Sequence, residues 1–185
     1  RLTERTSAET GTILSDSSGT GWGAPGTFTF LVLDHLKKKM LNPLMLLPPL
    51  KDGKAPVIKN VVAVSSQTEQ SAALGTAKTL KQGKWRFYAD TTDTIDNLDR
   101  DLCPFRVSVL VNGIEQATLP MEILAEENGA VFVQTPTPYD RRLYEDPARM
   151  YLGELSLTRG RADVSVIARD LAGNERSVLF GLQIE

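Results

Sequence analysis

The chain has 185 residues, 41% of them hydrophobic, which suffices for one sizeable domain or two small ones with a packed core. Its 21 basic and 23 acidic residues nearly cancel to a net charge of -2, which argues against the clustered basic face of a nucleic-acid-binding protein. The chain begins at Arg1 without an initiator Met or a signal peptide, so we expect it to be a processed or excised fragment.

The most apolar stretch runs from Thr27 to Pro49, TFTFLVLDHLKKKMLNPLMLLPP. Asp34, His35 and three lysines divide it, and neither half reaches the roughly 20 apolar residues of a membrane-spanning helix. We therefore predict two short apolar strands around a lysine turn, and no membrane span in this chain.

From about residue 57 onward, short β-branched and aromatic runs alternate with turn residues. A strand is predicted over Val57–Ser65, and residues 67–83 are predicted to be a loop. In the next strand, Lys84–Thr91, Trp85 and Phe87 share one face, for which core packing is the expected role.

Two Asn-Gly pairs predict β-hairpins, because both residues tolerate the positive φ angles of a type I′ turn. Asn112-Gly113 follows a strand that starts near Phe105, and Asn128-Gly129 joins two further apolar runs. A helical turn is predicted within Tyr139–Leu152. Short strands at this spacing indicate an all-β chain built as an antiparallel β-sandwich.

Residues 155–184, LSLTRGRADVSVIARDLAGNERSVLFGLQI, carry a particular strand–turn–strand pattern. Its elements are Leu157, Gly160, Val164, Val166, Ala168, Asp170, Ala172, Gly173 and Asn174. Asp and Asn cap their own backbone in such a turn, and Gly takes a conformation that a side chain would disfavour. The pattern resembles the closing strands of bacterial immunoglobulin-like domains, which implies an immunoglobulin-like sandwich over residues 52–185 and says little about activity.

The N-terminal part carries a glycine-punctuated loop, then the strand that ends near Leu33, then Leu41-Asn42-Pro43-Leu44. This order resembles the C-terminal third of a LytM-type (lysostaphin-like) zinc peptidase domain. The resemblance implies that residues 1–51 are the end of such a domain, contributing a short β segment before the sandwich. The alternative is that TFTFLVL is an ordinary half-buried strand.

The resemblance also implies that the peptidase site is lost. In the family an H-x-H motif supplies a zinc ligand and a catalytic histidine, and these two positions fall on Thr27 and Thr29 here. Threonine hydroxyls are poor zinc ligands. The degenerate positions predict no metal, no cofactor, no catalytic residue and no enzymatic activity in this chain.

Three other features have both a functional and a structural interpretation. Clustered aspartates at 90–101 form an acidic loop, with solvation as the simpler interpretation and calcium binding as the alternative; the candidate ligands are Asp90, Asp93, Asp96 and Asp99. Trp22, between two glycines, is a possible exposed contact residue. Cys103, the single cysteine, is predicted to be buried filler in the core.

Taken together, these features predict a non-catalytic binding or scaffolding protein of the bacterial cell envelope, periplasmic or extracellular. Its partner would be an envelope protein, peptidoglycan, or the missing N-terminal part of the same protein. Two alternatives remain: part of an active zinc endopeptidase completed by upstream residues, and a purely structural adhesive or spacer module.

Overall fold

The computed structural model describes residues 32–34, 36, 39–49, 51–96, 101–127, 130–133, 144–146 and 149–185. Val32–Glu185 forms one compact unit. Nearly all of its regular structure is strand, and the one helical element within the described ranges is the 3-10 turn η1, Pro43–Met45. None of the described helical segments is long or apolar enough to cross a membrane. The all-β prediction is confirmed.

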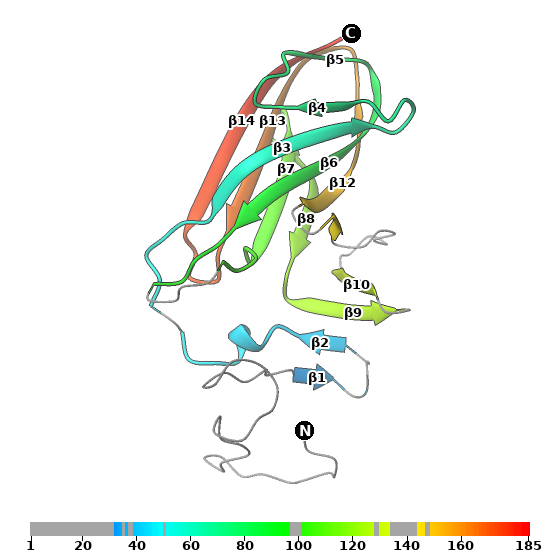
Figure 1. The fold of residues 1–185 in the computed structure, drawn as a ribbon. Helices are drawn as coiled ribbons and strands as arrows, with labels where there is room; N and C mark the ends of the chain where they lie inside the picture. The colour runs from blue at the N-terminus through cyan, green and yellow to red at the C-terminus, as the bar shows by residue number, and fades with distance from the viewer. Residues whose placement is uncertain are drawn as a thin grey trace, which may run out of the picture. The chain divides into compact units, whose positions relative to one another are not determined.

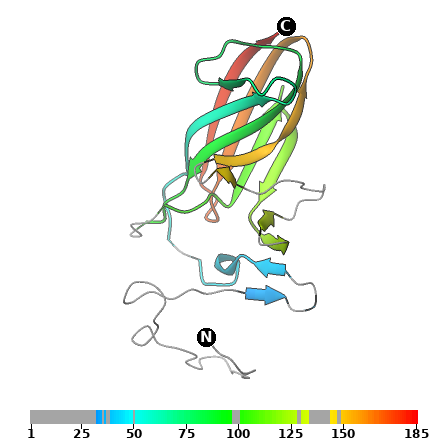
Figure 2. The same ribbon diagram turned by 45° about the vertical axis from the view of Figure 1, so that its right-hand side comes forward.

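Two five-stranded sheets pack against each other (Figures 1 and 2). The first has the order β11-β12-β6-β3-β4, with bounds Tyr144–Asp146, Arg149–Leu157, Gly83–Thr92, Val57–Ser65 and Ser71–Ala73. The second has the order β5-β14-β13-β7-β8, with bounds Thr79–Leu80, Glu175–Ile184, Gly160–Arg169, Arg106–Val111 and Ile114–Pro120. All pairings within them are antiparallel except that of β5 with β14.

The core lies between these sheets and follows the period-two alternation of the strands. Phe87 of β6 and Val164, Val166 and Ala168 of β13 have no exposed surface, and Trp85 is 4% exposed. The core role predicted for Trp85 is therefore confirmed. Its indole Nε1 donates a hydrogen bond to the Lys81 carbonyl (2.8 Å), which satisfies the one polar atom of the ring.

The predicted hairpins form. Asn112 and Gly113 join β7 to β8 with φ angles of 51° and 79°, the left-handed conformation that the Asn-Gly pair accepts most readily. β9 (Ile123–Glu127) pairs with β10 (Ala130–Val133), so the second Asn-Gly pair also stands between paired strands. β13 and β14 pair along their whole length, as the C-terminal pattern predicts.

A third, four-stranded sheet has the order β1-β2-β9-β10. β1 (Val32–Asp34) and β2 (Lys39–Leu41) form the predicted apolar hairpin, and β2 pairs with β9. The described residues between 32 and 41 are thus joined to the remainder of the unit by strand pairing. Its proposed descent from a peptidase domain stays a prediction.

Two local predictions are wrong, and a third is wrong for the residues that the structure describes. Residues 67–83 hold the short strands β4 and β5 in addition to turns. Arg149–Leu152, at the end of the predicted helical turn, lies in β12 because its apolar side chains are required in the core: Met150, Tyr151 and Leu152 are all buried. Cys103 is exposed, because it precedes β7 in the loop at the end of the sheet.

Replacing the central core side chain gives a direct test of this packing. Phe87→Ala is expected to lower the free energy of unfolding by about 3–5 kcal/mol, since it removes a fully buried ring and leaves a cavity. Urea denaturation measures the change. Leu179→Ala is the control, because Leu179 is 69% exposed and its truncation should alter stability by less than about 0.5 kcal/mol. Equal effects of the two substitutions would contradict the fold.

Candidate functional site

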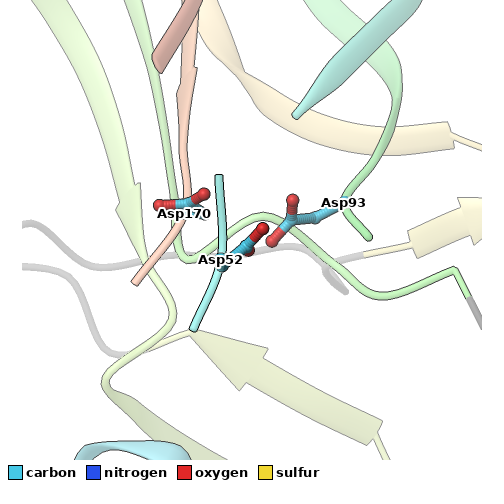
Figure 3. Close-up of side chains that lie close together, drawn as sticks. All are labelled: Asp52, Asp93 and Asp170. Carbon is cyan, nitrogen blue, oxygen red and sulfur yellow. The ribbon is translucent and has the colours of Figure 1, made fainter. Parts of the chain in front are cut away.

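Three aspartates from separate parts of the chain meet at one end of the sandwich (Figure 3). Asp52 precedes β3, Asp93 directly follows β6, and Asp170 directly follows β13. One carboxylate oxygen of each lies within 4.8 Å of the others. We call this group the aspartate cluster. β3 and β6 are antiparallel, with Val57 opposite Thr92, so the residues before β3 and after β6 necessarily lie at the same end.

Asp93 is fixed by the backbone. Its amide donates to the Leu102 carbonyl (2.8 Å), and the Leu102 amide donates back to the Asp93 carbonyl (2.7 Å), which closes the base of the acidic loop. The carboxylate accepts one hydrogen bond, from the Thr94 amide to Oδ1 (2.9 Å). Only 6% of the residue is exposed.

Asp170 is held by the turn that follows it. Its Oδ1 accepts a hydrogen bond from the Asn174 amide (2.8 Å), and its Oδ2 accepts one from Asn174 Nδ2 (2.7 Å). The same Nδ2 donates to the Asp52 carbonyl (3.1 Å), so one side chain joins the β13–β14 turn to the segment before β3. Asp170 is 2% exposed, and its hydrogen-bond donors among the described residues are neutral.

The electrostatics of the cluster follow from this arrangement. Burial raises the pKa of the Asp93 carboxyl from 3.8, and the nearby negative charges of Asp170 and Asp52 add to the rise, while the Thr94 amide opposes it; the resulting pKa is about 6. None of the ion pairs formed by the described residues involves an aspartate of the cluster. Its negative charge is therefore available to a cation.

A pocket with a cavity volume of about 360 Å³ opens over the aspartate cluster, and we call it the end pocket. Its wall is largely apolar and comes from the segment around η1 and from the loops at the end of the sandwich. The apolar side chains lining it are Leu44, Met45, Leu47, Pro49, Ile95, Leu102, Phe105, Leu171 and Ala172.

Asn42 fixes one side of this pocket. Its Nδ2 donates to the Met121 carbonyl (2.9 Å) and its amide to the Glu122 carbonyl (2.9 Å), which ties the segment to the β8–β9 connection. Its Oδ1 accepts from the Leu44 amide (3.1 Å) and caps η1, with Pro43 at the first helical position. The Asn-Pro pair thus positions the leucines that follow it.

The sequence-predicted site residues have different outcomes. Asp93 is in the cluster, whereas Asp96 accepts a hydrogen bond from the Gly53 amide (3.2 Å) and lies 3.7 Å from Lys54 Nζ, and Asp90 is part of β6. Trp22, Thr27, Thr29, His35 and Asp99 lie outside the described residues. A calcium loop made of Asp90, Asp93, Asp96 and Asp99 stays a prediction.

Sequence reasoning missed Asp52 and Asp170 as partners of Asp93. Both were visible as aspartates next to strand ends, in KDGKAP and ARDLAGN. What brings them together is the packing of one sheet on the other, and that packing has no local sequence signal. Carboxylate oxygens at this spacing suit a hard metal ion such as calcium or a protonated amine.

The Asn174 side chain should stabilise this end of the sandwich. Asn174→Ala is expected to lower the free energy of unfolding by about 1–3 kcal/mol, because Oδ2 of the buried Asp170 and the Asp52 carbonyl lose the donor Asn174 Nδ2. Urea denaturation measures it, with Asn60→Ala, at an exposed position of β3, as the control. A loss no larger than that of the control would show that the two hydrogen bonds of Asn174 Nδ2 do not contribute to stability.

Stability should depend on pH through Asp93. The pKa of about 6 lies above the ordinary value of 3.8, so the folded state binds the extra proton between these values, and the stabilisation is lost as pH rises through about 6. Asp93→Asn removes this dependence. The free energy of unfolding of the wild type minus that of the variant should fall by on the order of 2 kcal/mol from pH 4 to pH 7.

Urea denaturation at several pH values measures that difference. Asp101→Asn, at a carboxylate 64% exposed, is the matched control and should leave the pH dependence unchanged. A difference between wild type and Asp93→Asn that stays constant over the range would show that Asp93 titrates normally.

Comparison with known proteins gives one result that bears on the family of the chain. No curated protein matches it. Residues 55–185 match the model of one protein family, whose description states no activity, ligand or partner. The match does not speak to the LytM-type or immunoglobulin-like resemblance, and both stay predictions. Because these residues make up well over half of the 185, the chain belongs to this family.

Proposed function

We propose that the chain is a non-catalytic binding or scaffolding module of the bacterial cell envelope, and that it recognises its partner through the end pocket. The observation that carries the proposal is the pocket itself: an apolar wall over a negatively charged floor, with a volume of about 360 Å³. Binding sites of proteins are typically concave, mostly apolar and supplied with a few convergent polar groups.

The rim of the pocket supports a macromolecular partner. Met45, Leu47 and Leu171 line the pocket and still leave 48%, 45% and 43% of their surface exposed. Leu46, between two of them in sequence, is 61% exposed. Large apolar side chains gathered at the mouth of a pocket favour contact with another protein or a polymer surface, because binding there removes their area from water.

The support under the pocket favours a scaffolding role. Asp93 and Asp170 lie at the ends of β6 and β13, whose inward-facing side chains are buried in the core. Asn42 anchors the part of the pocket wall around η1 to the β8–β9 connection. A site on rigid elements keeps its geometry without a ligand, so little ordering free energy is lost on binding. The envelope location is supported by the resemblance of residues 1–51 and of the C-terminal pattern to envelope proteins.

A single charge at the rim should separate binding from folding. Leu47→Asp is expected to weaken partner binding at least about tenfold, because it removes apolar contact area and replaces it with a carboxylate that must lose water when the partner covers the rim. Leu179→Asp is the matched control: Leu179 is exposed, apolar and outside the pocket lining. It should bind as the wild type does.

Two assays measure the effect. The first is co-sedimentation of the purified chain with purified peptidoglycan, and the second is surface plasmon resonance with purified envelope amidases. Wild-type binding in neither assay would contradict the proposal and favour the spacer alternative. Binding that Leu47→Asp and Leu179→Asp affect equally would show that the end pocket is not the contact surface.

A further inference from the structure

The charge and shape of the end pocket define the chemistry of its occupant. We propose that the pocket receives a lysine side chain of a partner protein, with the ammonium group among Asp52, Asp93 and Asp170 and the methylene groups along the apolar wall. This inference rests on the proposed binding function and specifies which group of the partner is recognised.

The floor of the pocket suits an ammonium group. Such a group has three N–H donors, and the aspartate cluster offers three carboxylates. Donor–acceptor distances of about 2.8 Å around a tetrahedral nitrogen place three acceptors about 4.6 Å apart. The cluster oxygens lie within 4.8 Å of one another, so all three can bind the same nitrogen without a change in the backbone.

Two of the three carboxylates have an oxygen without a donor among the described residues, and the oxygens of Asp170, which accept from Asn174, each keep a second lone pair. Oδ1 of Asp93 accepts from the Thr94 amide, and Oδ1 of Asp52 accepts from the Lys54 amide (3.0 Å). Neither Oδ2 atom has a hydrogen-bond donor within the described part of the chain. Asp93 is nevertheless 94% buried, since 6% of it is exposed, and its side chain points toward Asp52 in Figure 3. Because Asp93 lines the pocket, an incoming cation would replace solvent as the partner of this carboxylate.

The wall distinguishes an alkyl amine from a bare metal ion. Calcium takes six to eight oxygen ligands, whereas the aspartate cluster supplies three carboxylates. A metal ion makes no use of Leu44, Leu102 and Phe105, whereas the four methylene groups of lysine need such a surface. The exposed rim around Leu47 adds a place for the backbone and neighbouring side chains of the partner.

Lysine peptides test the inference directly on the purified chain. The probe is acetyl-Ala-Lys-Ala-amide, titrated to about 20 mM while ¹H–¹⁵N correlation spectra are recorded. Amides of Asp52, Thr94 and Leu171 are expected to shift in a saturable way. The same peptide with an acetylated lysine keeps the stem and loses the charge, and it should bind at least about tenfold more weakly.

Single substitutions show which carboxylates bind the lysine peptide. Asp93→Asn should weaken the lysine peptide at least about fivefold, because one charge-assisted hydrogen bond is lost. Asp101→Asn, an exposed carboxylate outside the pocket lining, should leave the affinity unchanged. A separate titration with calcium chloride examines the metal alternative.

Several outcomes would overturn the inference. They are the absence of saturable shifts with the lysine peptide, equal binding of the acetylated peptide, or shifts produced by calcium alone. If Leu47→Asp abolishes partner binding while the lysine peptide gives no response, the lysine inference fails and the proposed function stands. If Leu47→Asp leaves partner binding intact, the proposed function fails, whatever the peptide does.

Discussion

Burial of alternate side chains between two sheets is the constraint on which the rest of this structure depends. With Phe87 facing the core from one sheet and Val164 and Val166 from the other, every connection must lie at an end of the sandwich. The start of β3 and the ends of β6 and β13 share one end, so three aspartates that are far apart in sequence become neighbours. The candidate site is a direct consequence of the core.

The aspartate cluster lowers the stability of the folded chain when no cation is bound. Three carboxylates at close range repel one another, and burial of Asp93 adds a desolvation cost that raises its pKa to about 6. Neutral donors, chiefly Asn174 and the Thr94 amide, hold the carboxylates in place without cancelling their charge. A bound cation would offset this repulsion and stabilise the folded chain. The electrostatic cost of the unbound cluster therefore contributes to cation recognition.

Sequence patterns predicted the parts of the fold that depend on local chemistry. The Asn112-Gly113 turn and the β13–β14 pair follow from residues that are adjacent along the chain. Sequence patterns failed where tertiary contacts determine the secondary structure. Arg149–Leu152 belongs to β12, despite a nearby proline, because Met150 and Leu152 are buried in the core. The candidate site was predicted only through Asp93, since its partners depend on how the two sheets pack.

Family membership by itself does not account for the end pocket. The matched region begins at residue 55 and contains Asp93 and Asp170, whereas Asp52 and the wall formed around Leu44 and Leu47 precede it. The negative floor is thus mostly part of the sandwich, and the apolar wall is shared between the sandwich loops, which supply Leu102 and Phe105, and the segment that Asn42 anchors to the β8–β9 connection. A sandwich without that segment would keep two of the carboxylates and lose one side of the apolar wall. The complete pocket therefore needs residues 42–52, which the matched region does not include.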